Sequence, residues 1–135
     1  MNQYLTSNDI ETIRIAIADT LSTPRTYNHS LRSYQKQLDV ILGRIRDIQT
    51  HNEKLLTEWT DEKKFAEEWN IEIPDYPILK NINFSKEEIE IIKEVFQETK
   101  KEYPSDDLLS TYLGESVETL DFTITKLDLE LKNYE

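Results

Sequence analysis

The sequence predicts an all-α protein, an elongated four-helix bundle with heptad-like seams in which two helices are long and two are shorter. Three observations favour this class. Apolar side chains recur at alternating steps of three and four residues along much of the chain. The 2 Gly and 4 Pro among 135 residues are too few for the turns of a many-stranded β protein. The 15 Leu and 15 Ile can build one core, so we expect a single helical domain over residues 1–135.

The first helix is expected over about residues 6–21. Thr6 is a suitable N-cap because Asp9 follows three residues later and can close a capping box. Pro24 ends this helix and suits the first turn of the next one, since proline lacks the N–H that a helix interior needs.

The second helix is expected over about residues 24–58, with an extension or a restart to residue 69. Its seam alternates steps of four and three residues: Tyr27, Leu31, Tyr34, Leu38, Ile41, Ile45, Ile48, Asn52, Leu55 and Trp59. A single helix over residues 27–69 would be roughly 65 Å long, whereas a compact domain of this size is roughly 35–40 Å across. Because Thr60 can cap a new helix, we expect a bend or break there.

An extended, proline-containing strap is expected at residues 71–84. Pro74 and Pro77 exclude a helix, yet half of the residues are apolar, which is not typical of a disordered linker. We expect the strap to pack over the bundle, with three side chains buried: Tyr76, Ile78 and Leu79. The alternative is an exposed docking patch shared with neighbouring aromatic residues: Trp59, Phe65, Trp69 and Tyr76.

The third and fourth helices are expected over about residues 85–103 and 105–134. A capping-box pattern begins at Ser85, and Pro104 separates the two helices. The 105–134 segment repeats the four-three spacing, and Gly114 is the weak point within it.

The charge is strongly negative and uneven. The chain has 27 acidic and 16 basic residues, a net charge of −11. Residues 1–52 have a net charge of +1, whereas residues 53–135 carry 22 acids and 10 bases, a net charge of −12. Such a surface repels phosphates, so we expect no direct nucleic-acid partner. No uncharged stretch is long enough for a membrane span or a signal peptide, so we expect a cytoplasmic protein with no membrane partner.

No catalytic residue, cofactor site or metal site is predicted. The chain has no Cys, its 2 His do not stand at metal-ligand spacing, and no Gly-rich phosphate loop is present. The main hypothesis is therefore a non-enzymatic acidic protein that binds a basic surface of another protein. An inhibitor or immunity-type protein of a bacterium, phage or mobile element would fit this description.

Four glutamates in the third helix are the charged candidates for partner binding: Glu90, Glu94, Glu98 and Glu102. They stand at successive i, i+4 positions, where like charges repel by about 0.2–0.5 kcal/mol per pair. One interpretation is a solvated helix face. The other is a carboxylate ridge that binds a basic protein surface or mimics nucleic-acid phosphates.

A self-assembling coiled-coil scaffold is the second hypothesis. In this interpretation Asn52, the polar member of the long seam, fixes the register of a homo-oligomer. Alternatively, Asn52 marks the point where the seam leaves the core.

An HEPN-like ribonuclease is the third hypothesis. The stretch from Arg46 to His51 resembles the Arg-polar-x-x-x-His motif of HEPN-type ribonucleases, which are also small helical proteins. The resemblance covers six residues and implies that His51 transfers protons while Arg46 holds a phosphate. The two residues lie about 140° apart around a helix.

Overall fold

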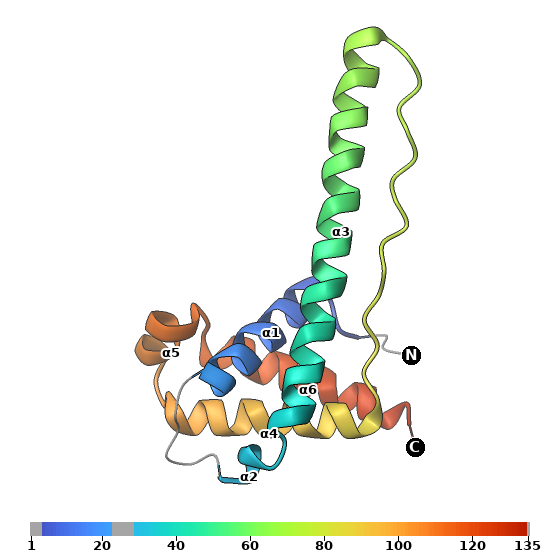
Figure 1. The fold of residues 1–135 in the computed structure, drawn as a ribbon. Helices are drawn as coiled ribbons and strands as arrows, with labels where there is room; N and C mark the ends of the chain where they lie inside the picture. The colour runs from blue at the N-terminus through green and yellow to red at the C-terminus, as the bar shows by residue number, and fades with distance from the viewer. Residues whose placement is uncertain (1–3, 23–28, 135) are drawn as a thin grey trace. The chain divides into compact units, whose positions relative to one another are not determined.

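The structure is a computed structural model that describes residues 4–22 and 29–134, and its regular elements in these ranges are all helical (Figure 1). The helices are α1 (Ser7–Ser22), α2 (His29–Arg32), α3 (Gln35–Trp69), α4 (Lys86–Glu102), α5 (Asp106–Leu113) and α6 (Val117–Lys132). The all-α prediction is confirmed for the described residues. The expected start of the second helix, at residue 24, lies outside them.

The chain divides into two compact units. The first comprises Met1–Gly43 and Asn83–Glu135, and the second comprises Arg44–Ile82. The first unit contains α1, α2, α4, α5, α6 and the beginning of α3, and the second contains the rest of α3 with the segment that follows it.

The core of the first unit lies where α1, α4 and α6 pack on one another, and α5 packs against α1. Its innermost side chains are apolar and fully buried: Ile13, Ile17, Leu38, Ile41, Phe84, Ile89, Ile92, Phe96, Leu109, Leu120 and Leu127. Apart from Phe84, which precedes α4, and Leu109 in α5, these positions fall on the apolar faces that the helical spacing predicts. Burial of these faces is the main favourable term in folding.

Two helices begin where the capping patterns predict. In α1, the Thr6 amide donates to Asp9 Oδ2 at 2.8 Å, and the Asp9 amide donates to Thr6 Oγ1 at 3.3 Å. In α4, Ser85 and Glu88 form the reciprocal pair of a capping box. The side chains thereby satisfy backbone N–H groups that a helix start leaves without partners.

The prediction of one helix over residues 105–134 is wrong, and two helices replace it. Gly114 has a φ of 67°, in the left-handed region, and terminates α5. Ser116 then caps α6 by accepting a hydrogen bond from the Thr119 amide at 3.1 Å. The break follows from local chemistry, because glycine adopts a left-handed C-cap easily and serine is a strong N-cap. The four-helix count is therefore wrong as well.

The two glycines are expected to respond in opposite directions to alanine. Gly114→Ala should lower the free energy of unfolding by about 1–2 kcal/mol, because an L side chain at a φ of 67° is strained. Gly43→Ala should raise it by up to about 1 kcal/mol, because Gly43 lies within α3 and an added Cβ meets no atom within 4 Å. Urea denaturation of both variants measures the difference, and a stabilised Gly114→Ala variant would contradict the αL cap.

The predicted break near Thr60 is also wrong, because α3 continues through this residue to Trp69. The Thr60 hydroxyl donates to the Leu56 carbonyl at 2.8 Å, which keeps threonine compatible with a helix interior. A turn at residues 33–34 separates α2 from α3, so α3 is about 52 Å long at about 1.5 Å per residue. The expected break assumed one compact body, whereas Arg44–Ile82 form a unit of their own.

Candidate protein-binding surface

The second unit is a helix with a returning extended segment. Asn70, with a φ of 55°, reverses the chain after Trp69, and the Ile71 amide donates to the Ala66 carbonyl at 3.0 Å. Residues 71–82, which we call the returning segment, contain neither helix nor strand and run back beside α3 (Figure 1). Asparagine at the reversal is suitable because it tolerates a positive φ better than most residues.

Side chains of α3 hold the returning segment through its backbone. The Asn52 amide group donates to the Lys80 carbonyl at 2.9 Å, and Asn52 Oδ1 accepts from the Lys80 amide at 2.8 Å. The Trp59 indole N–H donates to the Pro74 carbonyl at 3.0 Å. Asn52 therefore has a role that the seam did not predict, because its side chain satisfies both backbone groups of one residue.

Aromatic contacts strengthen the attachment near Trp59. The Tyr76 ring packs edge-on against the Trp59 ring, with 5.0 Å between centroids. The Lys63 ammonium lies 5.1 Å from the centroid of the same indole. Edge-on packing and a nearby cation both interact favourably with the quadrupole of an aromatic ring. These two contacts therefore order the side chains of Tyr76 and Lys63 around Trp59.

Asn52→Ala is expected to loosen the returning segment without unfolding the first unit. The variant loses two hydrogen bonds at once, so proteolytic cleavage within residues 71–82 should become faster by about tenfold. Limited proteolysis followed by mass spectrometry measures the cleavage site and its rate. Thr50→Ala, at an exposed position nearby on α3, is the control. Equal cleavage rates in the two variants would contradict the role of Asn52.

The predicted burial of the strap is wrong for two of its three residues. Tyr76 is 59% exposed and Ile78 is 93% exposed, and Leu79 is half-buried. The reason is geometric: within the second unit the returning segment packs on a single helix, which can cover only one of its sides.

The exposed apolar side chains of the described residues are concentrated in this unit. Twelve large apolar side chains are exposed, and six of them fall between residues 65 and 78: Phe65, Trp69, Ile71, Ile73, Tyr76 and Ile78. We call these six residues the 65–78 patch. The Phe65 and Trp69 rings lie 5.9 Å apart, and a hollow of about 420 Å³ is lined by Phe65, Ile71 and Pro74 together with acidic residues. A grouped apolar surface of this kind is typical of an interaction site.

Acidic residues are interspersed along the stretch of chain that carries the 65–78 patch. Between residues 58 and 76 the chain carries seven acidic and two basic residues. Three of the acids, Asp61, Glu62 and Glu72, line the hollow. The surface therefore combines apolar anchors with negative charge. Trp59, the fourth aromatic residue predicted for the docking patch, is half-buried.

The four glutamates of α4 do not share one accessible face. Glu90 is exposed, Glu94 and Glu102 are half-buried, and Glu98 is only 9% exposed. Glu98 accepts a hydrogen bond from Lys101 at 3.2 Å. Residues four apart are turned by about 40° around a helix, so the row winds by about 120° from Glu90 to Glu102.

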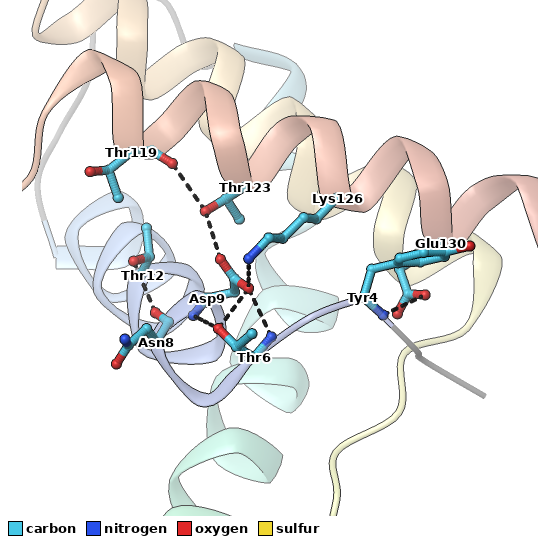
Figure 2. Close-up of polar contacts among 9 residues, drawn as sticks. All are labelled: Tyr4, Thr6, Asn8, Asp9, Thr12, Thr119, Thr123, Lys126 and Glu130. Carbon is cyan, nitrogen blue, oxygen red and sulfur yellow. Dashed lines mark hydrogen bonds and ion pairs between the residues drawn. The ribbon is translucent and has the colours of Figure 1, made fainter.

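A polar network joins α1 to α6 inside the first unit (Figure 2). Lys126 donates to Asp9 Oδ2 at 2.7 Å, and the Thr123 hydroxyl donates to Asp9 Oδ1 at 3.4 Å. Burial raises the pKa of Asp9, but hydrogen bonds from Lys126 and Thr6 together outweigh burial and hold the pKa below its ordinary 3.8. This network connects the start of α1 to the packed core, and we assign it a structural role.

Two residue sets from the sequence analysis concern metal and ribonuclease chemistry. Within residues 4–22 and 29–134, no group of three or more His, Asp or Glu is arranged to hold a metal ion. Arg46 and His51, the residues of the ribonuclease resemblance, are both exposed on α3. In the same ranges no helix is both long and apolar enough to cross a membrane.

Comparison of the chain with protein-family models, curated proteins and solved structures gives no match.

Proposed function

We propose that this chain is a non-enzymatic protein-binding protein, of the inhibitor or immunity type, that docks on a basic surface of a target protein through the 65–78 patch. The observation that carries the proposal is the concentration of exposed apolar side chains in one short stretch of the second unit. Aromatic anchors such as Trp69 and Tyr76 are the residue types that dominate binding energy in protein interfaces.

Charge defines the kind of partner. The seven acids and two bases between residues 58 and 76 favour an apolar pocket that is rimmed by Lys or Arg. Such a rim steers the two proteins together, so association should be fast at low salt and slower at high salt. The same negative charge opposes contact between two identical patches, which favours a target protein over self-assembly. Sedimentation at micromolar concentration should therefore give the mass of a monomer.

Site-specific photo-crosslinking tests the proposal. A photoreactive phenylalanine at Trp69 should crosslink one protein in the cells that make this chain, whereas the same group at Phe122 should not. Phe122 is a matched control because it is 61% exposed on α6, in the other unit, and Trp69 is 67% exposed. Equal crosslinking from both positions, or none from Trp69, would overturn the proposal.

The affinity of the purified pair gives the second measurement. Trp69→Ala should weaken binding by about 30-fold, the effect of losing one interface hot spot of about 2 kcal/mol. Glu67→Lys with Glu68→Lys should slow association and reduce its dependence on salt. If binding by the unaltered chain does not depend on salt, the acidic residues between 58 and 76 do not contribute to binding, and that part of the proposal is wrong.

A further inference from the structure

A groove in the first unit lies between the start of α3 and the first half of α4. It has a volume of about 530 Å³ and is formed by residues 34–40 on one side and 87–94 on the other. This size is in the range of sites that hold a small ligand or a few side chains of a partner. The groove belongs to the first unit alone, so its description does not depend on the 65–78 patch.

The floor of the groove is apolar and partly uncovered. Tyr34, Val40 and Ile91 contribute to its lining. Val40 is 64% exposed, although its neighbours Leu38 and Ile41 are buried in the core. Val40 is therefore an apolar side chain on the outward side of α3. A partner bound in the groove would cover it.

The rim of the groove is acidic. Glu87, Glu90 and Glu94 line it, against a single basic residue, Lys36. A fourth acid of the lining, Glu88, is already engaged with the Ser85 amide at 2.9 Å in the capping box. Glu94 Oε2 is shielded from solvent and has no hydrogen-bond partner in the described structure.

We propose that this α3–α4 groove binds a basic amphipathic helix of a partner protein. The net negative rim selects Lys or Arg, and the floor of Tyr34, Val40 and Ile91 selects an apolar stripe. The rim residues Glu87, Glu90 and Glu94 stand one helical turn apart. Lys or Arg residues three or four apart on a helix that lies along α4 would meet them in sequence.

A synthetic peptide tests the groove without knowledge of the natural partner. The probe is a peptide of about 15 residues of Leu and Lys, ordered so that Leu forms one helical stripe, and the control peptide has the same composition in scrambled order. Fluorescence anisotropy with the full chain measures affinity, and amide chemical shifts locate the bound peptide. We expect the ordered peptide to bind more tightly than the scrambled one, with shifts at residues 34–40 and 87–94.

Variants separate the groove from general acidity. Val40→Asp adds a negative charge, so pure electrostatics would tighten binding, whereas loss of the apolar floor should weaken it by about tenfold. Glu90→Lys should also weaken binding by about tenfold. Its matched control is Glu118→Lys, another exposed helical glutamate that lies on α6 outside the groove, which should leave the affinity within about twofold. Circular dichroism establishes that each variant is folded.

Each remaining outcome decides the proposal. The proposal is wrong if the unaltered chain does not bind the ordered peptide or binds both peptides equally. It is also wrong if Glu90→Lys and Glu118→Lys lose affinity equally, or if Val40→Asp binds more tightly. Trp69→Ala should bind the peptide as the unaltered chain does, and a loss there would place the peptide on the 65–78 patch instead. Failure of crosslinking at Trp69, by contrast, would leave the groove untouched.

Discussion

Phe96→Ala is expected to lower the free energy of unfolding by about 3–5 kcal/mol, a large part of the stability of a small protein. Phe96 is fully buried in α4, and α4 packs against both α1 and α6. Removal of the ring forfeits its burial and leaves a cavity that the surrounding helices fill only in part. Urea denaturation followed by circular dichroism measures the change.

Phe122→Ala is the matched control for this prediction. Phe122 is the same residue type in the same unit, but it is 61% exposed on α6. Its replacement should change stability by no more than about 0.5 kcal/mol. Leu120→Ala, at a fully buried position two residues earlier, should cost about 2–5 kcal/mol. Similar effects at Phe96 and Phe122 would mean that the core faces are assigned incorrectly.

Asp9→Asn is expected to lower the free energy of unfolding by about 2–3 kcal/mol at pH 7. The change weakens the capping box with Thr6 and leaves Lys126 half-buried without its counter-charge. Asp39→Asn, at an exposed position in α3, is the control and should be close to neutral. A neutral result for Asp9→Asn would show that the pair with Lys126 contributes no net stability.

The stabilising effect of Asp9 is also expected to depend on pH. The folded pKa of Asp9 lies below its ordinary 3.8, so its contribution is complete above that pH and is lost as the pH falls through the folded pKa. Glu115 has the opposite sign: burial raises its pKa, against a hydrogen bond from Thr12, so protonation on acidification favours the folded state. The stability difference between the unaltered chain and Asp9→Asn should therefore shrink below pH 3.8. A difference that stays constant would contradict the lowered pKa.

The helix starts were the most predictable part of the fold. Capping depends on three or four adjacent residues, so the patterns at Thr6 and Ser85 specify it locally. The choices at Thr60 and Gly114 were not settled by pattern, because each residue type suits two conformations. Thr60 can cap a helix or bond back within one, and Gly114 can weaken a helix or end it.

The sequence pattern does not determine whether the returning segment is buried. The apolar content of residues 71–82 is compatible with a packed strap and with an exposed surface. Burial is decided by the number of elements that cover a segment, and here the second unit supplies one helix. Of the residues in the docking alternative, Phe65, Trp69 and Tyr76 are exposed and Trp59 is half-buried.

The glutamate row and the α3–α4 groove show that residue spacing does not predict which charged side chains are accessible. Spacing placed Glu90, Glu94, Glu98 and Glu102 on one helix, but it could not indicate that Glu98 is buried. Val40 carried the sequence signal for the groove, because it is an apolar residue outside the seam that contains Leu38 and Ile41. Its pairing with α4 depends on tertiary packing, which spacing alone does not supply.

The two prolines of the returning segment limit how far a β-ladder could extend along its backbone. An extended, apolar backbone without a neighbouring strand is a template on which other chains can build a β-ladder. Pro74 and Pro77 each remove an N–H donor from the middle of residues 71–82, and the Pro74 carbonyl is already occupied by Trp59. A ladder that reaches residues 74–77 meets a missing donor at each end of this stretch, and beyond it both backbone groups of Lys80 are engaged by Asn52. The exposed apolar side chains of this segment therefore stand on a backbone that is a poor template for sheet growth.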